Sequence, residues 1–219
     1  SELEAELEAE LEAELEARRE QFIHYRQSLL QPEGSRTTTS LAEASVNLDT
    51  RRRPVTRAAR EPGEIPYYGA SGIVDWVSDY IFDGDYLLVS EDGANLLARS
   101  TSIAFSVSGK SWVNNHAHVL LLLLFPTYAS RRYAEHYLNS IDLAPHLTGA
   151  TQPKLNKANL DRILIPNPPE TEKARVVDIL DSLEALVSDL SSGLPAELAA
   201  RRKQYEYYRD KLLTFEEAT

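Results

Sequence analysis

Residues 2–17 repeat leucine, alanine and glutamate in a regular order, and no glycine or proline follows before residue 32. These residue types favour helices, and the repeat places a leucine at every fourth position. The pattern predicts one helix over residues 2–30, which ends at the Pro32 and Gly34 turn because proline cannot continue a helix. The glutamates repel one another at i,i+4 spacing, so we expect this helix to need a partner surface; a solvated low-complexity tail is the alternative.

Residues 35–168 show a different pattern, in which β-branched and aromatic residues are separated by glycine, aspartate and asparagine turns. This pattern is typical of short strands. We predict strands at 65–68, 86–90, 101–107, 119–124 and 162–165, a helix at 128–139 and a single helical turn at 156–161. The apolar run 119–125 is too short to cross a bilayer and is interpreted as a buried strand. The segment therefore predicts one mixed α+β domain.

The C-terminal segment returns to helical periodicity. Apolar residues at helical spacing predict an amphipathic helix over 171–190. The Ser191–Pro195 stretch predicts a break, because it contains both glycine and proline. A further helix is predicted over 196–215.

The two ends of the chain match each other. Residues 14–30 align without gaps to residues 197–213, and ten of the seventeen positions are identical. The shared Arg-Arg-x-Gln core, followed by Tyr-Arg, is more than helix composition alone would produce. We interpret the two segments as one helical module used twice, which buries its apolar stripe against a helix of the same chain or of a second copy. The predicted stripe consists of Leu15, Phe22, Tyr25 and Leu29 in one segment, and Leu198, Tyr205, Tyr208 and Leu212 in the other.

Charge is distributed unevenly along the chain. The net charge of −11 argues against a nucleic-acid binder, whose surface should be basic. Most of the excess acid, however, lies in the two flanking segments, and the middle segment is nearly neutral with clustered basic residues.

The chain has no cysteine, which excludes disulfides and thiolate chemistry and suits a reducing cytoplasm. No signal peptide is evident at the acidic N-terminus, so we expect a cytoplasmic location without a membrane partner.

Several short motifs together resemble a known family, the specificity (S) subunit of type I restriction–modification systems. The resemblance covers essentially the whole chain, and each motif by itself is weak. The motifs are Asn47-Leu48-Asp49 with Pro54-Val55-Thr56, Ile65–Gly72, Phe82-Asp83-Gly84-Asp85, Ser90-Glu91-Asp92-Gly93, Trp112–Leu120, Gly149–Asn156 and the Gln-Tyr-x-Tyr-Tyr-Arg of the last helix.

The resemblance implies a division into three parts. Residues 1–31 would be a central helix, residues 32–168 a target recognition domain, and residues 169–219 the distal helices, with the helices forming an antiparallel coiled coil. The family's full-length subunit has two recognition domains, whereas this chain has one and resembles the second half. Either the chain is a fragment, or two copies assemble head to tail as a homodimer that mimics a complete subunit.

The resemblance also implies a function without catalysis. The chain would read one half of a split site in double-stranded DNA and would scaffold the methyltransferase (M) and restriction (R) subunits. We expect no cofactor in this chain, S-adenosylmethionine in the methylating partner, and ATP with magnesium in the restriction partner. The helical arms would bind the methylating partner and set the half-site spacing.

The candidate DNA-binding residues are mostly cations and flexible turns. Five arginines lie within ten residues around Pro54, where they could contact phosphates or guanine edges. The alternative is a charged surface loop balanced by Glu61 and Glu64. The complete set of candidates is Arg51, Arg52, Arg53, Arg57, Arg60, Tyr67, Ser71, Gly72, Lys110, Lys154 and Lys157. Residues 149–157 could equally fix the junction between domain and helix.

Three readings that involve chemistry are disfavoured. His116 and His118 would share one face of a strand, but no further ligands with metal-site spacing accompany them, so no metal is expected. Asn167-Pro168-Pro169-Glu170 resembles an amino-methyltransferase signature, but it lacks the aromatic residue and a glycine-rich cofactor loop. Glu91-Asp92 is read as a turn rather than a nuclease site, and Trp112 as a core residue.

One rival class remains open. A coiled-coil adaptor whose middle domain binds protein would also explain the helical ends, and the net acidity supports it. A fused enzyme fragment would require a cofactor site that the sequence does not display.

Overall fold

The computed structural model describes residues 2–30, 37–98, 101–149 and 152–213, and it divides into two compact units. Unit 1 combines Ser1–Ser28 with Asp178–Thr219, and unit 2 holds Leu29–Val177. The turn predicted at residues 31–34 lies outside the described residues.

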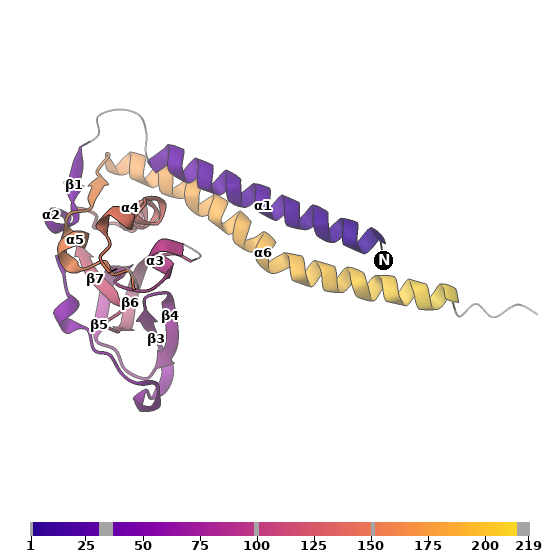
Figure 1. The fold of residues 1–219 in the computed structure, drawn as a ribbon, viewed down its shortest axis with the longest axis horizontal. Coiled ribbons are helices and arrows are strands. Elements are labelled where there is room, and N and C mark those ends of the chain that lie inside the picture. Colours follow the sequence, from indigo (N-terminus) through magenta and orange to yellow (C-terminus); the bar gives the residue numbers. More distant parts are fainter. Residues whose placement is uncertain (1, 31–36, 99–100, 150–151, 214–219) are drawn as a thin grey trace, which may run out of the picture. The chain divides into compact units, whose positions relative to one another are not determined.

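Six strands form the main sheet of unit 2 (Figure 1). They are β2 (Ser45–Asn47), β3 (Pro62–Gly69), β4 (Gly72–Val77), β5 (Phe82–Ser90), β6 (Ala104–Val113) and β7 (Ala117–Leu122). Their order is β2-β7-β5-β6-β3-β4, and only the β3–β6 pair is parallel. The short strands β1 (Thr38–Ser40) and β8 (Leu164–Pro166) pair antiparallel as a second sheet. The mixed sheet with helices confirms the α+β part of the predicted fold class.

Helix α4 (Tyr128–Ser140) covers part of the main sheet through contacts with β5 and β6. Its N-terminus is a capping box, in which the Thr127 and Ser130 side chains each accept from the other's backbone N–H. On its inner face, the Asn139 side-chain carbonyl accepts from the backbone N–H groups of Ile103 and Ala104, at 2.8 and 3.1 Å. Polar side chains of α4 thereby satisfy backbone groups at the start of β6, which would otherwise be buried without partners.

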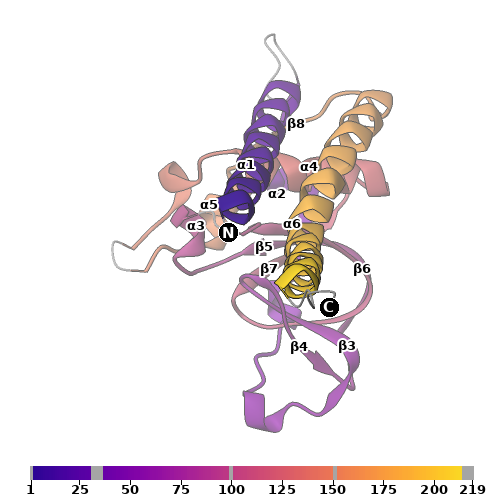
Figure 2. The ribbon, with the colours of Figure 1, turned by 90° about the vertical axis from the view of Figure 1, so that its right-hand side faces the viewer.

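Short helical segments connect the strands of unit 2. They are α2 (Leu41–Ala44), α3 (Asn95–Ala98) and α5 (Lys157–Asp161), with the 3₁₀ turns η1 (Asp49–Arg51), η2 (Arg57–Ala59) and η3 (Ala144–His146). β3 and β4 lie at the opposite end of unit 2 from β1 and β8 in both views (Figure 2). The loop that contains η1 and η2 leads directly into β3.

Two long helices supply unit 1, namely α1 (Glu2–Leu30) and most of α6 (Glu170–Leu213). They run in opposite directions within the unit (Figure 1). Arg26 of α1 lies close enough to Glu184 of α6 for the two charges to interact. The helix over 2–30 is confirmed, whereas the winding of the two helices as a coiled coil stays a prediction.

The predicted helix break at Ser191–Pro195 is wrong, because α6 continues through it. A proline inside a helix removes one backbone hydrogen bond and bends the axis, but it does not always end the helix. The α6 ribbon changes direction partway along its length (Figure 1), as an internal proline would cause.

Strand β4 was missed by the sequence pattern. Its apolar residues Ile73, Val74 and Trp76 are 47, 51 and 51% exposed, so they do not alternate with polar residues as a half-buried strand does. Pairing with β3 on one side alone defines β4 as a strand. β3 and β6 are also longer than predicted.

The first turns of α6 belong to unit 2. Pro169 precedes the helix, and Glu170 and Glu172 stand in its first turn, where acidic side chains interact favourably with the helix dipole. The Thr127 hydroxyl donates to the Glu170 carboxylate, and the Lys173 ammonium lies 4.4 Å from the Phe125 ring centre. Burial lowers the pKa of Lys173.

In the part of the chain that the structure describes, no helix has the length and apolar character needed to cross a membrane.

β7 lies between β2 and β5, and its side chains provide a test of the core. Leu120 is completely buried, whereas the next residue, Leu121, points to the other face and is 38% exposed. We expect Leu120→Ala to lower the free energy of unfolding by about 3 kcal/mol, because it leaves a cavity beside β5. Leu121→Ala is the matched control and should cost less than about 1 kcal/mol. Urea denaturation measures both, and equal losses would contradict the assigned strand register.

Candidate nucleic-acid interface

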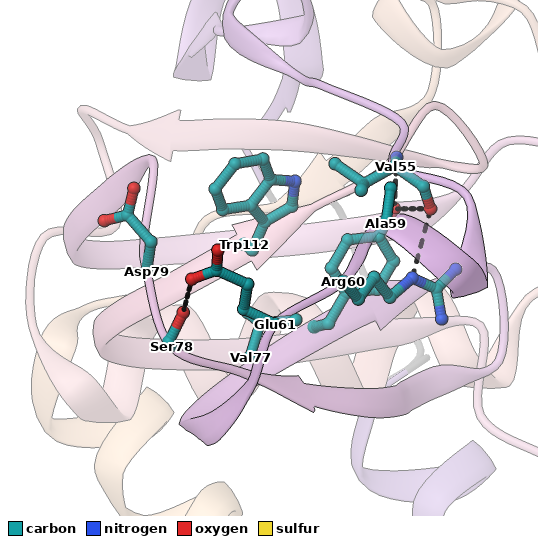
Figure 3. Close-up of a pocket in the computed structure, with 9 residues that line it drawn as sticks. Val55, Ala59, Arg60, Glu61, Val77, Ser78, Asp79 and Trp112 are labelled. Carbon is teal, nitrogen blue, oxygen red and sulfur yellow. Dashed lines mark hydrogen bonds between the residues drawn. The ribbon is translucent and has the colours of Figure 1, made fainter.

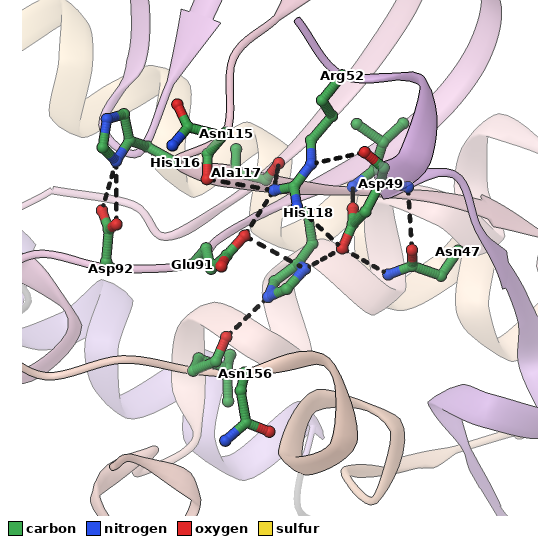
Figure 4. A network of polar contacts seen from close by, with 12 residues as sticks. Asn47, Asp49, Arg52, Glu91, Asp92, Asn115, His116, Ala117, His118 and Asn156 are labelled. Atoms are coloured by element: carbon green, nitrogen blue, oxygen red, sulfur yellow. Dashed lines mark hydrogen bonds and ion pairs between the residues drawn. The ribbon is translucent and has the colours of Figure 1, made fainter. Parts of the chain in front are cut away.

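A buried pair between Asp49 and His118 lies at the start of the arginine-rich loop (Figure 4). His118 is 1% exposed, and its Nδ1 lies 2.5 Å from Asp49 Oδ2. Its Nε2 lies 2.7 Å from the carbonyl oxygen of Leu155. Both ring nitrogens thus face acceptors, and both contacts are hydrogen bonds when His118 carries two ring protons. The imidazolium is then neutralised by the Asp49 carboxylate.

The Asp49 carboxylate is also held by its own neighbours. Its Oδ1 accepts from the backbone N–H of Val119 at 2.9 Å, and its Oδ2 accepts from the Asn47 side-chain amide at 3.0 Å. The Asp49 backbone N–H donates back to the Asn47 side chain at 3.0 Å. These bonds fix the first turn of η1 against β7.

Arg52 extends this network to a second carboxylate. Its Nη1 lies 2.6 Å from Glu91 Oε2 and donates to the carbonyl oxygen of Ala117 at 2.8 Å. Its Nη2 lies 3.4 Å from Asp49. Lys154 approaches Glu91 from the other side at 3.0 Å. Asp49, Arg52, Glu91, His118 and Lys154 together form what we call the anchor network.

The anchor network lowers the pKa of both carboxyl groups. Burial alone would raise the pKa of Asp49, but the hydrogen bond and charge of His118 outweigh it. Burial would likewise raise the pKa of Glu91, and hydrogen bonds from Arg52 and Lys154 outweigh it. Both carboxylates therefore stay charged, and the network joins η1, the end of β5, β7 and the segment before α5.

The loop that follows the anchor network is held mainly through backbone atoms. The Trp112 indole N–H donates to the carbonyl oxygen of Arg53 at 2.7 Å. The Val55 backbone N–H donates to the Tyr67 hydroxyl at 3.0 Å, and its carbonyl oxygen accepts from Arg60 Nε at 3.1 Å. These contacts fix the path of the chain and leave several side chains unconstrained.

The five arginines of this loop divide into two kinds. Arg52 and Arg60 are structural, since Arg52 belongs to the anchor network, and Arg60 pairs with Asp75 at 2.9 Å and covers the Tyr67 ring. Arg51, Arg53 and Arg57 are exposed and make no ion pair with any described residue. These three can neutralise an external anion without breaking an internal pair.

A groove of about 340 Å³ lies beside the exposed arginines. Thr50, Arg51, Arg53 and Ile81 line it. Arg51 is oriented by the ring of Phe82, 4.8 Å from its guanidinium carbon, and donates to the Ile81 carbonyl oxygen at 3.0 Å. Two guanidinium groups and a threonine beside an open groove form a site that suits a phosphate group.

The other candidate residues lie in varied environments. Tyr67 is 1% exposed, so its side chain cannot touch a duplex in this conformation, and the sequence-based expectation for it is corrected. Ser71 is exposed, and Gly72 adopts φ +94° beside the Phe105 ring, in a turn that favours glycine. Lys110 is exposed and lies 4.5 Å from the Tyr80 ring centre. Lys154 and Lys157 are exposed but already pair with Glu91 and Asp161.

The stripe of the helical module is only partly covered. Leu15, Phe22 and Leu29 are half-buried, whereas Tyr25 and Tyr208 are 41 and 53% exposed. The side chains of Leu198, Tyr205 and Leu212 lie outside the described residues.

The two histidines do not share one environment, which corrects the sequence interpretation. His116 precedes β7 and forms an exposed pair with Asp92 at 2.9 Å, whereas His118 is buried in the anchor network. The Asp49, Glu91 and His118 side chains converge within 4.8 Å, close enough to share a metal ion. Cations of the protein itself, Arg52 and Lys154, already pair with these carboxylates. The sequence could not reveal this cluster, because its members are far apart along the chain.

The chain belongs to the family described as type I restriction modification DNA specificity domain, which matches residues 38–200. A Haemophilus influenzae protein named as a type I restriction enzyme specificity subunit is 41% identical over 181 residues, which cover 81% of this chain and 46% of that protein. The MpnII specificity subunit of Mycoplasma pneumoniae is 29% identical over 90% of this chain and 62% of its own length. The chain thus spans about half the length of the first relative and under two thirds of the second.

Solved structures share the fold at low sequence identity. The S subunit of the type I restriction–modification system of M. genitalium matches all of this chain and 59% of its own, with a TM-score of 0.65 and 15% identity. The S subunit from Thermoanaerobacter tengcongensis matches 94% of this chain and 53% of its own, with a TM-score of 0.61 and 16% identity.

The anchor network predicts a strong difference between the two His–Asp pairs. We expect Asp49→Asn to lower the free energy of unfolding by about 3 kcal/mol at pH 7, because it removes the charged acceptor that lies against His118 and the Asn47 amide. The difference from wild type should shrink below about pH 4. The pKa values of Asp49 and Glu91 are lower in the folded protein than in the unfolded chain. The charged carboxylates therefore stabilise the fold at pH values above the unfolded-state pKa, and this stabilisation is lost as the pH falls through the folded-state pKa. Urea denaturation at several pH values measures this.

The matched control is Asp92→Asn. Its partner His116 has a side chain that is 50% exposed, so this change should cost less than about 1 kcal/mol. A loss for Asp49→Asn no larger than that of the control would rule out a stabilising role for the buried pair.

Proposed function

We propose that unit 2 binds one half of a split site in double-stranded DNA, as a non-catalytic specificity component. The observation that supports this most directly is the arginine loop, whose backbone is fixed while Arg51, Arg53 and Arg57 are exposed and make no ion pair with a described residue, and whose Arg51 and Arg53 line a groove. Phosphate contacts by such cations would position the domain, and neighbouring loop side chains would read base edges.

The net charge of −11 does not conflict with this proposal. Much of the acid lies in α1, which belongs to unit 1, whereas the arginine loop of unit 2 carries three exposed arginines within seven residues, Arg51, Arg53 and Arg57. Long-range repulsion between α1 and a duplex is screened beyond about 8 Å at physiological salt. Local charge at the groove therefore governs the contact.

The partners follow from the family. We propose that the chain acts with methylating subunits that use S-adenosylmethionine and with an ATP-dependent restriction subunit, in the cytoplasm. The helical module of unit 1 would bind the methylating partner. This division of labour assigns no chemistry to the chain itself.

Salt dependence of DNA binding tests the proposal. Changing Arg51, Arg53 and Arg57 together to alanine should reduce the slope of log K against log salt by about 2–3, because each neutralised phosphate contributes about 0.9. Fluorescence anisotropy with a random duplex measures the slope. Arg162 and Arg175 have exposed side chains away from the loop, and changing both to alanine is the control. An unchanged slope in the triple variant would remove the loop from the DNA contacts, and absence of any salt-dependent binding would favour a protein-binding adaptor.

We further propose that two copies pair through the helical module, so that two unit 2 domains serve one split site. Tyr25 and Tyr208 hold equivalent positions in the repeated segments, and both are exposed in the single chain. Two exposed aromatic side chains at matching positions favour a second copy of the chain as the surface that covers them.

Sedimentation tests this pairing. The wild-type chain should sediment as a dimer, and Tyr25→Glu with Tyr208→Glu should shift it to monomer while circular dichroism keeps the helical signal. Gln204→Glu introduces one glutamate at an exposed position of α6 next to the stripe and is the control for Tyr208→Glu alone; it should leave the dimer intact. A wild-type chain that is monomeric with intact helices would contradict the pairing.

A further inference from the structure

A second pocket, of about 260 Å³, is lined by Val55, Ala59 and Arg60 of the arginine loop together with residues of the neighbouring strands (Figure 3). Trp112 and Tyr67 contribute an aromatic wall, and their rings stack with centres 6.4 Å apart. Val55, Ala59 and Val77 supply apolar surface, and Arg60, Glu61, Ser78 and Asp79 supply the polar groups. The volume and the aromatic wall suit a flat ring of the size of a nucleobase.

The polar groups of the pocket are mainly hydrogen-bond acceptors. The carboxylates of Glu61 and Asp79 lie on one side of the view in Figure 3, and the Arg60 guanidinium lies on the other. Arg60 is already engaged by Asp75 and by the Val55 carbonyl. Glu61 accepts from the Ser78 hydroxyl at 3.2 Å, which orients its carboxylate and leaves further lone pairs available. The pocket therefore selects a ligand that donates hydrogen bonds.

The pocket and the groove are joined through Arg53. The Arg53 side chain lines the groove, while its carbonyl oxygen accepts from the indole N–H of Trp112, which lines the pocket. Val55, also in the pocket wall, follows two residues later, so at most about 7 Å of chain separates the two. An anion site thus adjoins an aromatic pocket lined with carboxylates.

We propose that this pocket binds the base of an unpaired nucleotide that carries an amino group on its Watson–Crick edge. The amino group donates to Glu61 or Asp79, the base lies against Trp112, and Arg51 and Arg53 hold the phosphate. The inference deepens the proposed DNA binding and rests on it. A base that leaves the stack costs free energy, so it is bound most readily where the duplex is distorted or single-stranded.

A cationic side chain of a protein partner is the other ligand that two carboxylates and an indole could attract. It is disfavoured because Arg60 lines the pocket itself and Arg53 lines the neighbouring groove, so a cationic ligand would also meet positive charge. A nucleotide matches both features, since its phosphate is anionic and its amino-substituted base is a neutral donor.

Trp112 can report the binding directly. The chain has two tryptophans, so Trp76→Phe leaves Trp112 as the single tryptophan, which can be excited selectively over the tyrosines, and Trp76 does not line the pocket. We would titrate this full-length variant with 2′-deoxycytidine and 2′-deoxyuridine 5′-monophosphates, which differ at the amino group and the adjacent ring nitrogen. The cytidine nucleotide should change the Trp112 fluorescence saturably and bind about fivefold more tightly, because uridine offers a carbonyl where the carboxylates need a donor.

Three variants in that background decide the assignment. Glu61→Gln with Asp79→Asn should abolish the preference, whereas Glu64→Gln with Asp83→Asn, at exposed positions outside the pocket, should preserve it. Arg53→Ala should weaken both nucleotides equally. Circular dichroism verifies that each variant is folded. Absence of a saturable change, equal affinity for the two nucleotides, or a preference that survives the pocket double variant would overturn the inference.

Duplex binding separates this inference from the proposed function. The pocket double variant should retain the wild-type salt slope with a random duplex, because the exposed arginines are intact. If the wild-type chain binds duplex DNA with the expected salt slope but shows no preference between the two nucleotides, only the pocket assignment is wrong. If the wild-type chain shows no salt-dependent duplex binding, the proposed DNA binding and the pocket assignment are both wrong.

Discussion

The structure of unit 2 depends on one buried electrostatic arrangement, the pairing of His118 with Asp49. The Asp49 carboxylate would be unstable alone in this partly buried site, because an unpaired charge there costs several kcal/mol. Arg52 and Glu91 complete the arrangement, and backbone donors satisfy the remaining carboxylate oxygen. Segments that are far apart in the sequence are thereby held together by charge complementarity as well as by apolar packing. The starting direction of the arginine loop is a consequence of that pairing.

This pairing also explains what the sequence motifs encode. Asn47-Leu48-Asp49, Glu91-Asp92, His116–His118 and the Lys154–Asn156 segment all belong to the motifs that carry the family resemblance. In the structure they meet around His118 (Figure 4). Much of the resemblance therefore reflects how the domain is held together. The surface that contacts a ligand is formed by other side chains of the same loops.

The elements that were predicted correctly are those with a local signal. The helix over 2–30 follows from composition, and a helix at 128–139 was predicted from the local sequence pattern alone. The sequence did not predict β4, because only its pairing with β3 makes it a strand, and the sequence around β4 does not reveal that pairing. The continuity of α6 through Pro195 escaped because the cost of an internal proline can be offset by the helix on both sides.

The candidate site was predictable as a region but not residue by residue. Five arginines around Pro54 look equivalent in sequence, and only their partners separate them. Arg52 meets Glu91 and Arg60 meets Asp75, which lie 39 and 15 residues away along the chain. Tyr67 was expected at the surface because of its glycine-rich neighbourhood, yet its hydroxyl serves the Val55 backbone. No rule of spacing or composition gives such pairings.

The way the arginine loop is fastened has an evolutionary consequence. Its main ties engage the carbonyl of Arg53 and the amide and carbonyl of Val55, atoms that every residue type other than proline possesses. Replacement of the side chains at positions 53 and 57 would leave those ties in place. A lineage could therefore exchange what this loop presents to its ligand, and so acquire a new preference, without first having to evolve a new scaffold.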